Sequence, residues 1–112
     1  MNYRPLRVGK LLREELAILI EKEIELDGAL ATITEVEVDK KLEHAKVRLS
    51  ILPSKAAEQG IKIFHSAQGH LQYLLMKKLN IKPMPRIEFV LDYGPEHAAK
   101  VEKILLKEEN NL

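Results

Sequence analysis

Strict alternation of apolar and polar side chains over residues 44–52 is the feature that most restricts what this chain can fold into. Every second residue of the run is apolar, at Ala45, Val47, Leu49 and Ile51. The residues between them are polar, at Lys46, Arg48 and Ser50. Successive side chains of a β-strand point to opposite faces, so this run predicts a strand with one buried face and one solvated face.

A second run with the same period precedes it at residues 32–39. One face of this run carries Thr34, Val36 and Val38, and the other carries Glu35, Glu37 and Asp39. The link at residues 40–43 is short and polar, which favours a hairpin. The glutamates then lie beside Lys46 and Arg48, and we interpret these charges as cross-strand ion pairs rather than a ligand site.

A third strand is predicted at residues 86–92, where Ile87, Phe89 and Leu91 fall at every second position. The segment that joins it to the second strand carries helical patterns. Such a crossover allows parallel entry through a right-handed connection. We therefore expect a three-stranded mixed sheet that helices cover on one face only.

The first helix is predicted from about Arg4 or Pro5 to Ile24. Its apolar arc comprises Val8, Leu11, Leu12, Leu16, Leu19 and Ile20. Basic residues gather in its first half and acidic residues in its second half, which is the reverse of the order that the helix dipole favours. This placement indicates that the bases contact a partner, the alternative being a solvated helix face. The bases are Arg4, Arg7, Lys10 and Arg13.

Two further helical patterns, over roughly residues 55–80, meet at Ala67-Gln68-Gly69. Glycine costs about 1 kcal/mol relative to alanine inside a helix, so Gly69 predicts a kink or a break. A valine at this position is accordingly expected to reduce stability. Ser54, directly after a proline, is the expected N-cap of the region.

A last helix is expected to start at Gly94-Pro95, because proline suits a first helical turn. Its apolar stripe comprises Ala98, Val101, Ile104 and Leu105. Residues 107–112 carry no pattern and are expected to fray. The chain has 112 residues and no repeat, so we expect a single domain over residues 1–112.

Composition excludes several classes of function. The chain has no cysteine, which rules out disulfides and thiolate chemistry. It has no apolar signal core and no apolar run of membrane-spanning length, so we expect a cytoplasmic protein. The net charge is only +1, so any nucleic-acid binding must come from the placement of charge. The four histidines are scattered and no phosphate-cradling glycine motif is present, so we expect no enzyme activity, metal or cofactor.

The predicted order, α-β-β-α-kink-α-β with a C-terminal helix, is that of an α+β, type II KH-like domain. A KH domain clamps single-stranded nucleic acid with a G-x-x-G loop between paired helices. Residues 66–69 read Ser-Ala-Gln-Gly and supply one of the two glycines. The usual clamp is therefore not expected. The fold analogy alone leaves a generic KH-like RNA-binding or protein adaptor module as the alternative function.

From Arg4 to about Leu105 the residues resemble the ribosome-binding factor A family. The resemblance opens with Arg4-x-x-Arg7-Val8 and continues through residues 32–38 and Ala45-Lys46-Val47. In that family an Ala-x-Gly kink replaces the KH clamp, so Ala67 and Gly69 are the expected kink residues. Gln72 and Lys82 stand where the family usually has arginine. The most specific part is Ala67-x-Gly69-x-Leu71-x-x-x-Leu75-x-x-x-Leu79-x-Ile81-x-x-x-Pro85-x-Ile87-x-Phe89.

The resemblance implies a non-catalytic bacterial ribosome assembly factor with a role in cold adaptation. It implies binding to the small (30S) ribosomal subunit through 16S rRNA near the decoding region. Late maturation of that subunit and rRNA processing are the steps that it would assist, beside assembly GTPases. We expect a monomer with no membrane partner.

The candidate RNA-binding residues come from both helical regions. They form one surface only if the kink folds the second half of residues 55–80 back toward the first helix. Sugars or base edges are expected to meet Ser66, Gln68 and His70. Phosphates are expected to meet Arg4, Arg7, Lys10, Arg13, Lys77, Lys78, Lys82 and Arg86.

Overall fold

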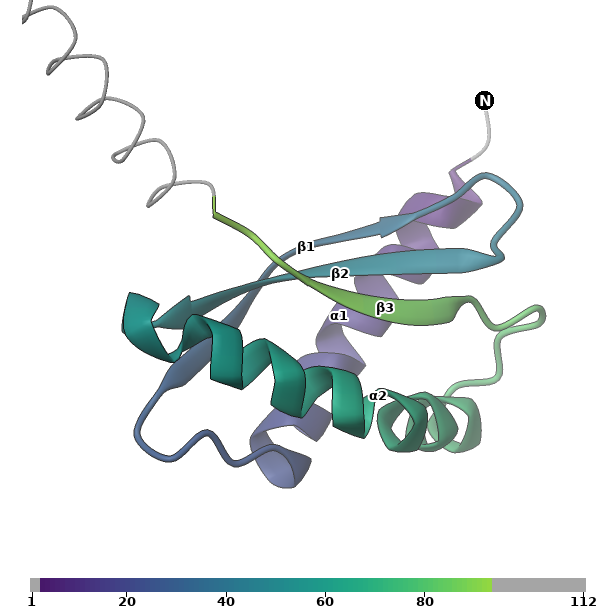
Figure 1. Ribbon diagram of the computed structural model, residues 1–112. Coiled ribbons are helices and arrows are strands. Elements are labelled where there is room, and N and C mark those ends of the chain that lie inside the picture. Colours follow the sequence, from purple (N-terminus) through teal and green to yellow (C-terminus); the bar gives the residue numbers. More distant parts are fainter. Residues whose placement is uncertain (1–2, 94–112) are drawn as a thin grey trace, which may run out of the picture.

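The computed structural model describes residues 3–93 (Figure 1). The first helix and the three strands lie where the sequence predicts them. The helix expected from Gly94 and the frayed tail lie outside the described residues. In chain order the elements are α1 (Arg4–Glu23), β1 (Leu30–Val38), β2 (His44–Leu52), the 3-10 turn η1 (Ser54–Ala56), α2 (Ala57–Lys78) and β3 (Arg86–Leu91).

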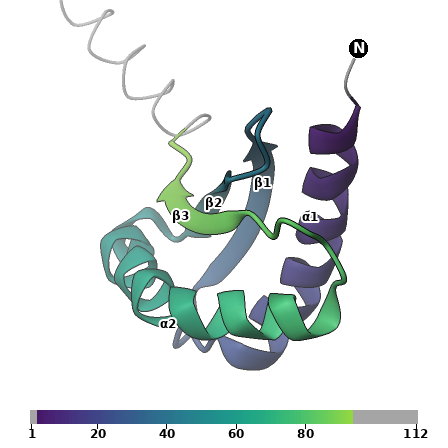
Figure 2. The ribbon, with the colours of Figure 1, turned by 90° about the vertical axis from the view of Figure 1, so that its right-hand side faces the viewer.

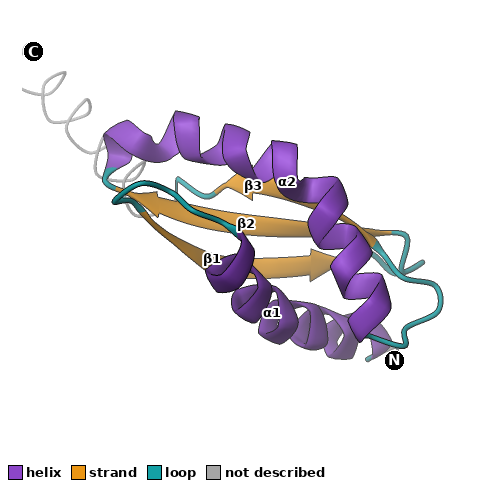
Figure 3. Ribbon diagram, turned by 90° about the horizontal axis from the view of Figure 1, so that it is seen from below, coloured by secondary structure: helices purple, strands orange, loops and turns teal. Residues whose placement is uncertain are grey.

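The three strands form one mixed sheet in the order β1-β2-β3. β1 and β2 are antiparallel, and β3 is parallel to β2. Figures 2 and 3 show both helices on the same face of the sheet, with α1 beside β1 and α2 beside β3. The predicted α+β architecture is confirmed, and the one-sided cover agrees with strands that have only one apolar face.

The core lies between the sheet and the two helices. Phe64 of α2 packs against Phe89 of β3, with ring centroids 5.1 Å apart. The prediction that Leu11 belongs to the buried arc of α1 is wrong, since this residue is 45% exposed. It lies about 100° around the helix from the fully buried Leu12 and so falls outside the stripe that faces the sheet. The predicted residues that are buried include Val8, Leu12, Leu16, Leu19, Ala45, Val47, Leu49 and Ile51.

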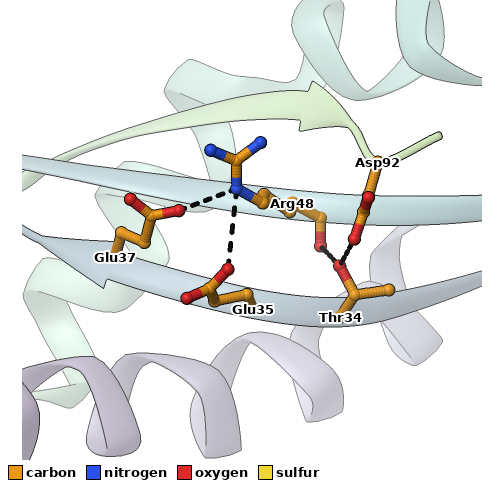
Figure 4. Close-up of polar contacts among 5 residues, drawn as sticks. All are labelled: Thr34, Glu35, Glu37, Arg48 and Asp92. Carbon is orange, nitrogen blue, oxygen red and sulfur yellow. Dashed lines mark hydrogen bonds and ion pairs between the residues drawn. The ribbon is translucent and has the colours of Figure 1, made fainter. Parts of the chain in front are cut away.

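β1 contains a bulge that the period-two pattern did not predict. The pairing with β2 shifts register between Ile33 and Glu35, which leaves Thr34 as the extra residue. As a result Ile33 and Val36 both pack toward the core, although they are three residues apart. The prediction that Thr34 shares the face of Val36 is therefore wrong. Its Oγ1 instead donates to Asp92 Oδ2 at 2.6 Å (Figure 4).

The start of α2 also differs from the prediction. Ser54 makes no capping hydrogen bond, and Ala56 occupies the N-cap position of α2. The Ala56 amide donates to the Pro53 carbonyl oxygen at 2.9 Å. The predicted Ser54 N-cap is therefore wrong, because a tight 3-10 turn leads into the helix and satisfies this amide through the backbone.

α2 is one continuous helix from Ala57 to Lys78, so the break that the sequence allowed does not occur. The helix nevertheless bends. Its first half runs along the sheet, and its second half, green in Figures 1 and 2, turns toward α1. Ala67 packs partly buried against the core, whereas a Cβ added at Gly69 would meet no atom of another element within 4 Å. The bend lies where α2 stops packing along the sheet and begins to turn toward α1, and the helix is uninterrupted there.

Two other glycines lie at close contacts between the helices and the sheet. A Cβ at Gly9 would lie 3.3 Å from the carbonyl oxygen of Val36, so α1 approaches β1 closely at this point. A Cβ at Gly60 would lie 2.9 Å from Cδ1 of the buried Ile51. The glycines that the packing requires are therefore Gly9 and Gly60, and Gly69 has room for a side chain.

Valine at Gly60 should lower the free energy of unfolding by about 1–3 kcal/mol, because the larger side chain overpacks against Ile51. The matched change Gly69→Val, which the sequence predicts to be destabilising, should instead stay within about 0.5 kcal/mol of the wild type, because space is open there and valine is no worse than glycine in a helix. Urea unfolding measures both changes. A loss at Gly69 as large as that at Gly60 would show that this glycine itself maintains the bend.

Candidate nucleic-acid interface

Three polar contacts tie the second half of α2 and the loop after it to α1. As residue numbers rise along α2, they fall along α1, so the two segments run antiparallel. The bend therefore folds the second half of α2 back toward α1, as a single basic surface built from both helices requires. The contacts join His70 Nε2 to Glu23 Oε2 (3.4 Å), Lys78 Nζ to Glu15 Oε1 (3.5 Å), and Arg4 Nη2 to the carbonyl oxygen of Lys82 (2.7 Å).

These contacts gather cationic side chains from two distant parts of the sequence at one end of the molecule. All the bases of α1 except Lys22 lie in its first half, and Lys77 and Lys78 lie in the last turn of α2. Glu21 and Glu23 lie at the other end of α1. We call the gathered set the basic end, and all its members are exposed: Arg4, Arg7, Lys10, Arg13, Lys77, Lys78 and Lys82.

Within the basic end, Lys10 and Arg13 lie on the flank of α1 that faces β1. Both line a shallow groove of about 450 Å³ between α1 and β1. Arg13 also donates from Nη2 to the carbonyl oxygen of Ile33 at 3.2 Å. Arg13 therefore supports the free edge of β1 at the bulge in addition to carrying its charge.

The cations from the end of α2 differ in their surroundings. Lys78 is paired with Glu15, whose side chain is only 13% exposed. Lys77 instead lies over the ring of Tyr73, with Nζ 5.2 Å from the ring centroid. Arg86 is an exposed residue that precedes the buried Ile87 in β3, so it faces the open side of the sheet, away from the helices. Arg86 is thus the predicted phosphate contact that lies on the opposite face of the sheet from the helices that carry the basic end.

The free edge of β3 is covered by polar side chains of α2. Gln72 donates from Nε2 to the Pro85 carbonyl oxygen at 3.0 Å and accepts from the Ile87 amide through Oε1 at 2.8 Å. Gln68 Oε1 accepts from the Phe89 amide at 3.2 Å. His65 Nε2 lies 2.7 Å from the Phe89 carbonyl oxygen and donates to it. These bonds satisfy backbone groups that an edge strand leaves unpaired.

The three residues expected to contact sugars or base edges differ in their surroundings. Ser66 and His70 are exposed, and His70 faces Glu23 of α1. Gln68 is half-buried and its amide oxygen is engaged by β3, so the structure gives it a role in the fold. Gln72, which stands where the resemblance leads one to expect arginine, has the same kind of role.

The open face of the sheet carries the cross-strand ion pairs that the sequence predicts (Figure 4). Arg48 Nε donates to Glu37 Oε1 at 2.8 Å and lies 3.7 Å from Glu35 Oε2. The hydrogen bond and the charge of Arg48 lower the pKa of the Glu37 carboxyl. A lowered pKa stabilises the fold at neutral pH, and this contribution fades as pH falls through the folded-state pKa. Arg48 is thus held by carboxylates, in agreement with its interpretation as a structural charge.

The β1–β2 hairpin lies at the same end of the molecule as the start of α1 (Figure 1). It carries Lys40 and Lys41, both exposed, for which the sequence pattern predicts only a place in the turn. Leu42 beside them is buried with a φ of 60°, so the turn is anchored into the core and presents its lysines outward. In the sequence, two consecutive lysines next to an apolar turn residue could have indicated that the turn is anchored by its leucine and presents both lysines to solvent.

The same hairpin contains the carboxylates and imidazole that come closest to a metal-ligand set within residues 3–93. Ligand atoms of Asp39, Glu43 and His44 lie within 4.8 Å of one another, and all three side chains reach solvent. Asp39 Oδ1 accepts from the backbone amides of Glu43 and His44 at 2.7 and 3.3 Å. Although burial opposes its ionisation, these amides lower the pKa of Asp39 overall. The closeness of these three side chains is explained by Asp39, which caps the turn through these two hydrogen bonds.

A bent helix replaces the KH clamp, three strands form a mixed sheet, and bases from two helices meet at one end. Together these features define a KH-like domain without a G-x-x-G loop. The chain belongs to the ribosome-binding factor A family, whose model matches residues 4–105. Within residues 3–93, neither helix combines the length and the apolar character that crossing a bilayer requires.

Other members of the family match most of the chain. Ribosome-binding factor A of Opitutus terrae is 35% identical over 107 residues, which span 94% of this chain and 87% of the relative. The factor of Thermomicrobium roseum is 34% identical over 107 residues, which span 93% of this chain and 82% of that protein.

Solved structures show the same fold. The crystal structure of ribosome-binding factor A from Thermus thermophilus has a TM-score of 0.67 at 21% identity and covers 80% of this chain and 97% of its own. A Thermus thermophilus homology model, fitted into a cryo-EM map of a 30S complex of the factor, has a TM-score of 0.62 at 20% identity. It covers 77% of this chain and 92% of its own.

Leucine at Gln72 should lower the free energy of unfolding by about 1–3 kcal/mol, because it leaves the Ile87 amide and the Pro85 carbonyl unsatisfied at a covered strand edge. Urea unfolding measures the loss, and faster hydrogen exchange at the Ile87 amide locates it. The matched control is Gln59→Leu, at an exposed position of α2, with a change within about 0.5 kcal/mol. Unchanged stability in Gln72→Leu, with weakened RNA binding, would instead make Gln72 an RNA contact.

Proposed function

We propose that this protein binds the small ribosomal subunit through 16S rRNA, near the decoding region, and assists late maturation and rRNA processing. Membership of the ribosome-binding factor A family supports the proposal. So does the shared fold with a Thermus thermophilus factor whose coordinates were fitted into a map of a 30S complex. The protein acts as a monomer in the cytoplasm, beside assembly GTPases.

The antiparallel contact between α1 and the second half of α2 is the observation that carries this proposal. It places Arg4 next to Lys82 and holds Lys78 against Glu15. Arg7 and Lys10 lie on α1 between these two contacts. Cations from both helices are thus held on a rigid pair of elements, which suits the spaced phosphates of a folded RNA backbone better than a flexible tail does.

Charge placement also orients the protein on RNA. Four bases lie in the first half of α1, whereas Glu21 and Glu23 flank a single lysine in its last turn, so opposite ends of this helix attract and repel phosphates. The basic end therefore faces the rRNA, and the acidic end of α1 faces away from it. An almost neutral chain obtains an oriented, salt-dependent attraction in this way.

The mechanism requires binding energy and no chemical step. Stronger binding to one conformation of immature rRNA shifts the population toward that conformation. Occupation of the site also delays partners that need the same rRNA surface. Release follows when the mature conformation no longer matches the basic end, and this step is the one on which an assembly GTPase would act.

Glutamate at both Arg7 and Lys10 should weaken binding to 30S subunits by roughly tenfold or more, because two cations that meet phosphates become anions. Co-sedimentation with 30S subunits across a salt series measures the affinity. The slope of log affinity against log salt should also fall by roughly 1.5–2. Thermal unfolding should change little, because both side chains are exposed.

The matched control is the double change Lys55→Glu and Lys62→Glu, which alters the net charge equally at exposed positions outside the basic end. It should leave the salt slope unchanged. Equal weakening by both double variants would show that net charge matters and the basic end does not. Failure of the wild type to co-sediment even at low salt would reject the proposed function itself.

A further inference from the structure

The solvent face of the second half of α2 carries an exposed aromatic residue at the basic end. Tyr73 is 55% exposed. The core-facing Leu71 and Leu75 lie two residues to either side, so Tyr73 points away from the core at about 100° per residue. Within residues 3–93 the structure assigns its side chain one partner, the Lys77 ammonium 5.2 Å from the ring centroid. The ring is therefore presented to solvent and has no part in the core.

Gly69, Tyr73 and Lys77 are spaced by four residues and form one column along the helix surface. Aromatic side chains in helices lean toward the helix N-terminus, so the ring of Tyr73 leans toward Gly69. Apart from the adjacent residues and the helix's own backbone, no atom lies within 4 Å of a Cβ built at Gly69. One side of the ring thus carries a cation, and the space toward Gly69 is open.

The space beside Gly69 is open to solvent and can admit a planar ring. A nucleobase stacks on an aromatic side chain whatever its sequence, because every base has a π-face. The neighbouring ammonium suits the phosphate of the same nucleotide, and Lys77 forms no ion pair within the described residues 3–93. Only an unpaired nucleotide can offer its face, since bases within a duplex are stacked on one another.

Resting on the proposed function, we propose that the Gly69-Tyr73-Lys77 column binds an unpaired rRNA nucleotide, with its base stacked on Tyr73 and its phosphate beside Lys77. Packing does not require glycine at position 69, but a glycine there leaves room for the base. The column adds a contact with single-stranded RNA to a surface that otherwise recognises the phosphates of folded RNA.

The test compares Tyr73→Leu, which removes the π-face, with Tyr73→Phe, which keeps it. The first probe is a short oligoadenylate that carries one 2-aminopurine, whose fluorescence falls when it stacks. Tyr73→Leu should weaken binding roughly 5- to 100-fold and abolish the quenching, whereas Tyr73→Phe should retain both. Tyr93→Leu, at another exposed tyrosine, should bind as the wild type does. A short RNA duplex should bind equally to all four proteins.

Co-sedimentation with 30S subunits separates this proposal from the proposed function. Tyr73→Leu should weaken subunit binding without changing the salt slope, because no charge is removed. If Tyr73→Leu binds oligoadenylate as the wild type does, the stacking proposal is overturned, even where Arg7 and Lys10 still govern subunit binding. Loss of subunit binding alone, with oligoadenylate binding intact, would also overturn it and assign Tyr73 to a ribosomal protein.

A variant with a side chain at Gly69 tests the position of the base independently. Gly69→Val should reduce oligoadenylate affinity and quenching while the unfolding free energy stays near that of the wild type, because the side chain enters the space that the base needs. Unchanged quenching in Gly69→Val would overturn the placement of the base on this side of the ring. Urea unfolding of both variants detects a structural loss separately.

Discussion

The two free edges of a three-stranded sheet are the constraint on which the rest of the structure depends. Each edge strand leaves alternate amides and carbonyls without a partner strand, and covering them without hydrogen bonds is costly. Gln68 and Gln72 of α2 meet this requirement at β3. At β1, Arg13 reaches the bulge and Gly9 lets α1 approach closely. The positions of both helices follow from these requirements at the two edges.

The bend of α2 has a consequence for charge as well as for packing. A straight helix anchored on β3 would carry its last turn away from α1, and the two sets of bases would lie apart. The bend brings Lys78 to Glu15 and the following loop to Arg4. The largely buried carboxylate of Glu15 therefore offsets part of the repulsion among the cations of the basic end. The exposed bases remain on a supported surface, as the proposed binding of rRNA by a chain with a net charge of only +1 requires.

Alternation predicted the strands well, because which face a side chain takes is a local property of extended chain. It failed at Thr34, where a bulge depends on the register with β2. The basic residues of α1 were recognisable from their unfavourable place in the helix dipole. Gln68 and Gln72 were not recognisable as parts of the fold, because a polar residue on a helix has the same local signature whether it meets water or a strand edge.

By itself, the sequence determined the types of element, the buried faces, the order of a KH-like domain and the family resemblance. These follow from spacing within short segments, where neighbouring residues decide the outcome. Only the tertiary structure decided that α2 continues through Gly69, that amide side chains close the edge of β3, and that bases far apart in the chain share one end. The physical reason is that each of these outcomes depends on atoms supplied by another element. Hydrogen-bond partners and charge neighbours of this kind exist only after the helices have packed on the sheet.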